Sequence, residues 1–248
     1  MHPSMIYRLS LSELRLSLRE WSSTAFGLAL PVCLLIGLGS ISGVDRVDPA
    51  TGRRGIDTWV PSLCVTLAVG MLAWFILPMT LCGYRDRGVL RRLAATPARP
   101  AALLAAQLIV NMLFAVVSLG AVFAVAALAL GMAAPHNIAG LAMVLFVGIL
   151  AMFGVGLLLA AIVPSQRAAQ GVNWAVFALS AFLAGIDLPI QMLPRWVGQL
   201  GGYTPMGAFR FALEDVWVGE GLHPKYLVVF VVTAVVTWFG AVRSFRTD

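Results

Sequence analysis

Residues 58 to 97 read TWVPSLCVTLAVGMLAWFILPMTLCGYRDRGVLRRLAATP, and they place an uncharged run, 58 to 84, directly before the most basic segment of the chain. That segment contains Arg85, Arg87, Arg91 and Arg92 with a single acid, Asp86. A helix of about 20 apolar residues crosses the hydrocarbon core of a bilayer. The run therefore predicts a membrane span, and the arginines predict a segment that remains outside the bilayer at one end of it.

The rest of the chain has the same composition. Of its 248 residues, 60% are hydrophobic and only 11% are charged, whereas soluble domains carry about 25% charged residues. We therefore expect an integral membrane protein with one membrane domain. The net charge of +6 would suggest nucleic acid as a partner in a soluble protein, but in a membrane protein basic residues hold loops at the cytoplasmic surface. We predict no nucleic-acid partner.

Apolar runs and the breaks between them predict an all-α fold with six membrane spans. Residues 100 to 166 contain no Asp, Glu, Lys or Arg, and GMAAPHN at 131 to 137 divides this stretch into two helices. The expected spans are 22–44, 58–83, 101–130, 138–162, 168–187 and 226–242.

Residues 5 to 21 form an amphipathic pattern before the first span. Leu11, Leu14 and Leu18 recur at steps of three and four, and Arg8, Arg15 and Arg19 form a neighbouring stripe. Such a helix lies in the membrane interface with its arginines toward the headgroups. The alternative is a simple cytoplasmic extension of the first span.

The segment 188 to 222 is divided by prolines into apolar pieces that are too short to span. The expected helices are 192–200 and 205–218, with Gly201 and Gly202 as the turn between them. Short apolar helices of this kind are often re-entrant or interfacial. We expect a re-entrant hairpin in the outer leaflet.

The distribution of Lys and Arg sets the expected orientation. With both termini inside, the inner segments hold eleven of the 17 Lys and Arg residues and the outer segments hold six. Basic residues accumulate in cytoplasmic loops, so both termini and the segment 84 to 99 are expected in the cytoplasm.

Motifs for catalysis or energy conversion are missing from the sequence. There is no G-x-x-x-x-G-K-[ST] loop for ATP, and the single lysine is Lys225. No metal-binding or catalytic pattern occurs, and Cys33, Cys64 and Cys82 resemble small buried apolar residues. The predicted spans also lack the ionisable residues of ion-driven carriers. We therefore expect a protein that is not an enzyme and has no cofactor of its own, so that any energy for work comes from a partner.

The basic segment 85 to 97 has the features of a docking element. As a helix it would present Val89, Leu90 and Leu93 as an apolar edge beside its arginines, and it would end before Pro97. The alternative is a basic loop that only sets the orientation of the chain in the membrane.

Two motifs resemble those of ABC-2 type permeases. RDRGVLRRLAATPARP, residues 85 to 100, resembles the cytoplasmic segment after the second span, although the acid there is often Glu and here is Asp86. LPIQMLPRWVGQLGGYTPMGAFRFAL, residues 188 to 213, resembles the motif before the last span. The two motifs occur in the order and at the spacing found in this family, and the resemblance covers essentially the whole chain. Among the subgroups of the family, the chain most resembles the daunorubicin/doxorubicin-resistance-like export permeases.

The resemblance implies a function. Such permeases work in bacterial cell membranes as dimers, of identical chains or close paralogues, with two cytoplasmic ABC ATPase subunits that bind ATP and Mg. It implies ATP-driven efflux of a hydrophobic or amphiphilic molecule such as an antibiotic, with a lipid or polysaccharide exporter as the alternative. A membrane docking or sensor subunit that does not transport remains a different possibility. The implied ATPase-coupling residues are Arg85, Asp86, Arg87, Gly88, Leu90, Arg91, Arg92 and Leu93. The implied outer re-entrant motif is Pro194, Trp196, Pro205 and Arg210.

Some side chains within and near the spans carry weaker expectations. Four aromatic residues either line a pathway for an amphiphile or face lipid and neighbouring helices. These are Trp74, Phe75, Trp174 and Phe177. Four amide side chains are expected to hydrogen-bond between helices. These are Gln107, Asn111, Gln170 and Asn173. Arg210 and Glu214 lie one turn apart and either pair or remain solvated.

Overall fold

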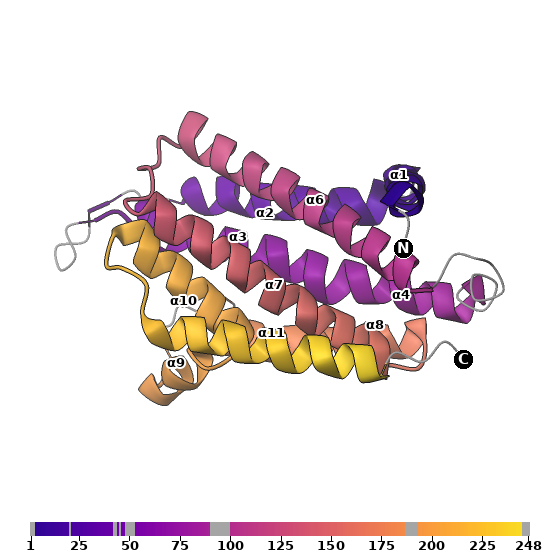
Figure 1. Ribbon diagram of the computed structural model, residues 1–248. Coiled ribbons are helices and arrows are strands. Elements are labelled where there is room, and N and C mark those ends of the chain that lie inside the picture. Colours follow the sequence, from indigo (N-terminus) through magenta and orange to yellow (C-terminus); the bar gives the residue numbers. More distant parts are fainter. Residues whose placement is uncertain are drawn as a thin grey trace.

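A computed structural model describes residues 3–19, 21–41, 44, 46–47, 53–89, 100–186 and 193–244. Within these residues the regular structure is helical, apart from an isolated bridge between Val47 and Arg54. The helices form an elongated bundle (Figure 1). This confirms the all-α prediction for the part of the chain that is described.

Four long helices are apolar enough to cross a membrane. The first is continuous from Trp59 to Asp86 and comprises α3 (Trp59–Met71), a π-helical turn η2 (Leu72–Ile76) and α4 (Leu77–Asp86). The others are α6 (Pro100–Leu128), α7 (Ile138–Ile162) and α11 (Pro224–Ser244). Each contains the roughly 20 residues that the hydrocarbon core requires. Four of the six expected spans are thus long, apolar helices in the structure.

Two further helices, α2 and α8, correspond to the remaining expected spans. Helix α2 (Trp21–Gly39) contains Pro31. Its stretch Ala29–Gly39 is apolar but shorter than a membrane span. Helix α8 (Gln166–Leu183) is not among the four, because its first half carries polar residues such as Gln170 and Asn173. Both helices pack along the bundle (Figure 1).

Glycines allow α7 to lie at the centre of the bundle against α10, α11 and η2. A Cβ atom added to Gly156 would lie 1.8 Å from the carbonyl oxygen of Ala73 in η2. A Cβ atom added to Gly148 would meet the Phe209 ring of α10 at 2.3 Å. Small residues let helix backbones approach closely inside a membrane, where the hydrophobic effect does not drive helices together.

The short helices lie at opposite ends of the bundle. Helix α1 (Pro3–Arg19) is seen end-on in Figure 1, so its axis runs across those of the long helices, as expected for an interfacial helix. It lies at the same end as the last turns of α4 and α11, which we call the α1 end. Helices α9 (Arg195–Gly201) and α10 (Pro205–Val218) lie toward the other end, here called the α9 end, with the 3₁₀ turn η1 (Gly55–Asp57). The bounds of α10 are those predicted, whereas α9 begins three residues later than predicted, after Pro194.

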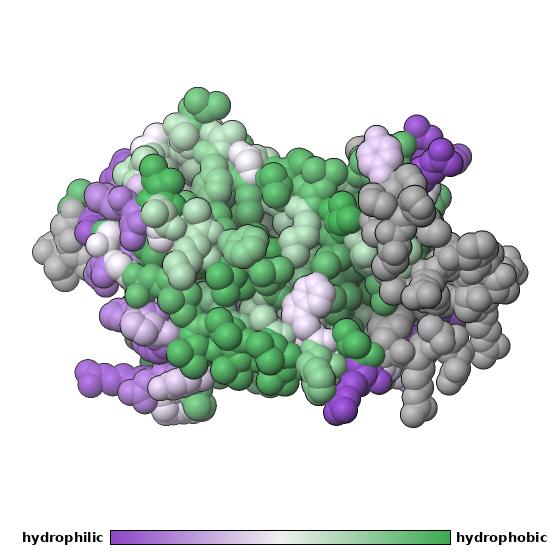
Figure 2. All heavy atoms as spheres, viewed as in Figure 1, coloured by the Kyte–Doolittle hydropathy of each residue, from purple (hydrophilic) through white to green (hydrophobic). Residues whose placement is uncertain are grey.

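Polar and apolar side chains are distributed unevenly along the length of the bundle. Apolar side chains cover the middle of the visible face, and polar side chains gather toward its two ends (Figure 2). Many large apolar residues along the long helices are exposed, among them Val116, Phe146, Val235 and Phe239. An apolar belt of this size indicates a surface in contact with lipid.

Candidate functional site

The end of α4 is held against the turn between α7 and α8 by two neighbouring residues of opposite charge. The Arg85 guanidinium donates hydrogen bonds to the carbonyl oxygens of Val163, at 2.7 Å, and Ala160, at 2.9 Å. The backbone N–H of Gln166 donates to Asp86 Oδ2 at 2.9 Å. The Arg85 cation therefore satisfies carbonyl groups at the C-terminal end of α7, and the Asp86 anion satisfies an amide at the N-terminal end of α8. Each charge has the sign that the dipole of its helix favours at that end.

Apolar packing completes this junction, which we define as residues 82–88 together with 160–169. Cys82, Val163 and Ala169 form a small buried cluster, and Cys82 is fully buried. A Cβ atom on Gly83 would be tight against the side chains of Arg87 and Gln166, at 3.1 and 3.2 Å. The junction thus joins α4, α7 and α8 through both polar and apolar contacts.

The helix that carries the junction ends at the motif predicted to begin the docking element. Arg85 and Asp86 lie in the last turn of α4, so the helix ends three residues later than the predicted span 58–83. The chain then leaves the helix at Arg87 and at Gly88, whose φ of +66° lies in the left-handed region that favours glycine. The predicted helix 85–97 therefore does not begin as one element at Arg85, because residues 85–86 end α4 and residues 87–88 form a turn. Leu90, Arg91, Arg92 and Leu93 lie outside the described residues, so the course of the segment beyond Val89 remains a prediction.

Arg87 differs from Arg85 because its side chain is exposed. Its Nε donates to the carbonyl oxygen of Gly83 at 3.0 Å, and its guanidinium lies 5.6 Å from the centre of the Tyr84 ring. These contacts orient the side chain without burying it. Arg87 is thus available to another protein, whereas Arg85 is engaged within the bundle.

A second polar cluster ties α1 to the same junction. Glu13 is 6% exposed and accepts hydrogen bonds from the Tyr84 hydroxyl and from the Gln107 side-chain amide. Asn111 donates to the backbone carbonyl of Gln107 at 2.9 Å. The expected hydrogen bond between helices is therefore confirmed for Gln107, whereas the Asn111 bond lies within α6. Glu13 was not singled out from the sequence, since an acid in an amphipathic helix ordinarily lies on the solvated side.

The other two amides behave differently. Asn173 is fully buried on α8, and its side chain has no hydrogen-bond partner within the part of the chain that is described. Gln170 is exposed and borders an open depression beside Asp86, Ser165 and Arg167. The structure thus gives Asn173 no interhelical hydrogen bond and places Gln170 on the surface near the junction.

Arg210 holds the opposite end of α8. It is 3% exposed and donates to the carbonyl oxygens of Ala184, at 2.5 Å, and Gly185, at 3.2 Å. Glu214 Oε2 lies 3.6 Å from its Nη2 atom, which confirms the expected pairing and shows that Arg210 is not a solvated charge. Burial raises the pKa of the Glu214 carboxyl, and Arg210 opposes this shift. Asp86 and Arg210 therefore engage the two ends of the same helix.

The other three residues of the outer motif lie at the start of α10 and around α9. Pro205 is the first residue of α10, and the Thr204 hydroxyl accepts the N–H of Gly207 at 3.1 Å as its cap. Pro194 precedes α9, and Trp196 within it is exposed. Of the four motif residues, Arg210 alone is buried against α8.

The four aromatic residues separate into two environments. Phe75, Trp174 and Phe177 form one cluster, with ring centres 4.8 Å apart for Phe75–Trp174 and 5.2 Å for Phe75–Phe177. Trp74 is instead buried against α7, where its indole N–H donates to the carbonyl oxygen of Met152 at 3.0 Å. The cluster involves η2, and π-helical turns often occur at functional sites.

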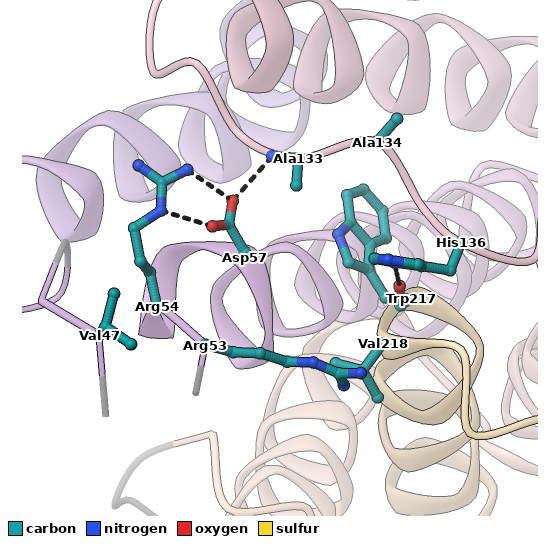
Figure 3. Close-up of a pocket in the computed structure, with 9 residues that line it drawn as sticks. All are labelled: Val47, Arg53, Arg54, Asp57, Ala133, Ala134, His136, Trp217 and Val218. Carbon is teal, nitrogen blue, oxygen red and sulfur yellow. Dashed lines mark hydrogen bonds and ion pairs between the residues drawn. The ribbon is translucent and has the colours of Figure 1, made fainter. Parts of the chain in front are cut away.

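A cavity of about 250 Å³ lies at the α9 end (Figure 3). Asp57 joins two loops there, because it pairs with Arg54 at 2.6 Å and accepts the backbone N–H of Ala133 at 2.7 Å. His136 contacts the carbonyl oxygen of Trp217 on α10 (Figure 3). These contacts connect the loops before α3 and α7 with the end of α10.

The fold and the junction define a helical membrane protein in which charged residues connect the end of one span to the ends of its neighbours. The sequence model of the ABC-2 type transporter family matches residues 6–208, which is most of the chain. The chain belongs to this family, whose members are membrane components that work with separate ATPase subunits. The comparison with curated proteins gave no match.

Proposed function

We propose that this protein is the permease subunit of an ATP-driven exporter in the bacterial cell membrane, with six spans, a re-entrant outer hairpin and both termini in the cytoplasm. The family match supports a permease. The proposed unit contains two permeases and two cytoplasmic ATPases, which bind ATP and Mg. The substrate is a hydrophobic or amphiphilic small molecule, in keeping with apolar spans that contain no fixed charge in their central parts.

The proposal rests on the hydrogen bonds by which Arg85 and Asp86 hold the ends of α7 and α8, which we call the clamp. In this mechanism the part of the segment 85–97 that follows Asp86 seats in a groove of the ATPase. Its contacts are provided by Arg87, Gly88, Leu90, Arg91, Arg92 and Leu93. Arg85 and Asp86 face the bundle instead and hold the ends of α7 and α8. A displacement of the segment is therefore carried into both helices.

Helix α8 can pass this displacement to the opposite end. Its 18 residues extend about 27 Å, from the Asp86 contact to the Arg210 contact. A movement of its first turn pulls on α10 through Arg210 and shifts the hairpin that caps the proposed pathway. The cluster of Phe75, Trp174 and Phe177 lies on this helix and its neighbour, where it would contact an amphiphile in transit.

Charge reversal tests the coupling. Arg87→Glu, Arg91→Glu and Arg92→Glu, combined in one chain, should remove stimulation of the co-purified ATPase and drug transport in vesicles, with membrane insertion unchanged. The matched control is Arg53→Glu, Arg195→Glu and Lys225→Glu at the α9 end, which should leave ATPase stimulation intact. Normal transport by the triple variant would refute the docking assignment.

The choice of substrate needs a separate readout. Reconstituted complexes should expel a hydrophobic fluorescent drug with ATP, and Trp174→Ala should reduce that rate. Movement of labelled lipid or polysaccharide in place of the drug would identify the alternative exporter. ATPase binding with no movement of any of these would instead indicate a docking or sensor subunit.

A further inference from the structure

Helix α1 has two faces with different partners. Glu13 lies on its inner face and is buried against α4 and α6. The opposite face is exposed and carries Arg8, Ser12, Arg15 and Arg19 at steps of four and three, which places them in one row along the helix. Within the part of the chain that the structure describes, these three arginines form no hydrogen bond or ion pair with the bundle.

Apolar side chains flank the arginine row. Leu11 is 37% exposed, Leu16 49% and Leu18 59%. The row and its neighbours enclose an open depression. It is lined by Arg8, Leu11, Ser12, Arg15, Leu16 and Arg19. A face that combines cations with exposed leucines matches the boundary where lipid phosphates meet acyl chains.

The position of α1 fits the same boundary. The helix crosses the axes of the long helices at the end of the apolar belt (Figures 1 and 2). A bilayer that covers the apolar belt would place its phosphate groups at this level, and each arginine near an anionic leaflet is attracted to it. A purely solvated helix would gain nothing from its exposed leucines.

From these observations we infer that the outer face of α1 binds the phosphate groups of anionic phospholipids, and that Glu13 transmits the state of this site to the end of α4. Glu13 and the lipid-facing arginines are on one rigid helix, so a shift of α1 moves the carboxylate. The carboxylate holds Tyr84, which directly precedes Arg85 and Asp86. Lipid that favours one position of α1 thereby favours one arrangement of the junction.

Lipid retention tests the first step. The purified chain in nanodiscs of phosphatidylcholine with phosphatidylglycerol should retain phosphatidylglycerol in native mass spectrometry. Arg8→Gln, Arg15→Gln and Arg19→Gln together should weaken its retention about 100-fold, since each arginine contributes roughly fivefold. The control Arg53→Gln, Arg195→Gln and Lys225→Gln removes the same charge at the α9 end and should leave retention unchanged. Equal loss in both triple variants would overturn the proposal, as would loss in neither.

Hydrogen exchange tests the second step. Phosphatidylglycerol should slow amide exchange in residues 77–89 of the natural chain compared with phosphatidylcholine alone. Glu13→Gln should retain the lipid but abolish this response, and Tyr84→Phe should do the same by removing the donor. A response in both variants equal to that of the natural chain would disprove the link.

The main competing occupant of this face is an ATPase subunit, and it would give a different pattern in the same variants. If the arginine triple variant retained phosphatidylglycerol but lost ATPase binding, the face would belong to the ATPase and the lipid site would be refuted. Lipid retention and hydrogen exchange need neither ATPase nor transported substrate. Their failure would therefore leave the export proposal standing, and failure of export would leave the lipid site standing.

Discussion

Replacing Arg85 with Gln should open the junction locally, and Cys82 provides a direct measure of that opening. Cys82 is fully buried, and its sulfur lies 3.9 Å from the same two carbonyl oxygens, Ala160 and Val163, that Arg85 contacts. In a chain with Cys33→Ser and Cys64→Ser, Cys82 is the remaining thiol. Its labelling by a thiol reagent then reports how often the junction opens.

The magnitude follows from the hydrogen bonds that are lost. Arg85 makes two charge-assisted bonds in a half-buried setting, and bonds to charged groups contribute about 1.5–3 kcal/mol each when buried. Because partial exposure weakens such bonds, we expect a loss of about 2 kcal/mol, which increases labelling of Cys82 about 30-fold. Loss of the Arg85 cation disfavours the thiolate, which is the form that reacts with the reagent. A direct effect of the substitution on the thiol would therefore slow the labelling of Cys82, whereas opening of the junction speeds it.

Two controls make the result decisive. Arg195→Gln removes an exposed arginine at the α9 end and should leave Cys82 labelling unchanged. Labelling of Cys64 in a chain that retains only that thiol should also be unaffected by Arg85→Gln, because the opening is local. If Cys82 labelling in Arg85→Gln equals that of the parent, the clamp does not hold the junction closed.

Two other positions give equally specific predictions. Gly156→Ala should destabilise the bundle by more than about 3 kcal/mol, because its Cβ would overlap the Ala73 carbonyl, whereas Gly120→Ala, with nothing within 4 Å, should be neutral or slightly stabilising in a thermal melt. Equal melting temperatures would show that α7 and η2 are not in close contact. Arg210→Met should cost about 2 kcal/mol, or about 5 °C in Tm, because two carbonyls of the α8 end and Glu214 lose their partner. The matched Arg195→Met should not change Tm, and an unchanged Tm in Arg210→Met would refute the structural role of Arg210.

Local patterns account for the parts of the fold that were predicted correctly. Long uncharged runs form helices because backbone groups in a bilayer must be satisfied within the segment. The GMAAPHN break separates α6 from α7, and Pro205 and Gly219 bound α10 where the prediction placed its ends. The polarity of α8 explains why it differs from the other expected spans, since its first turns carry groups that pack at the junction.

Hydropathy and turn residues along the chain are enough to predict the helical membrane class and the main breaks, and two motifs indicate the family. What the charges do depends on how the helices pack. Asp86 could not be given a role from its place in the motif, because that role depends on the amide end of α8 lying beside it. The contact of Arg210 with the end of α8 likewise could not be read from its motif, and Glu13 was not singled out at all. Hydropathy is a property of each segment alone, whereas the pairing of a side chain with a distant helix end depends on which helix ends meet in space.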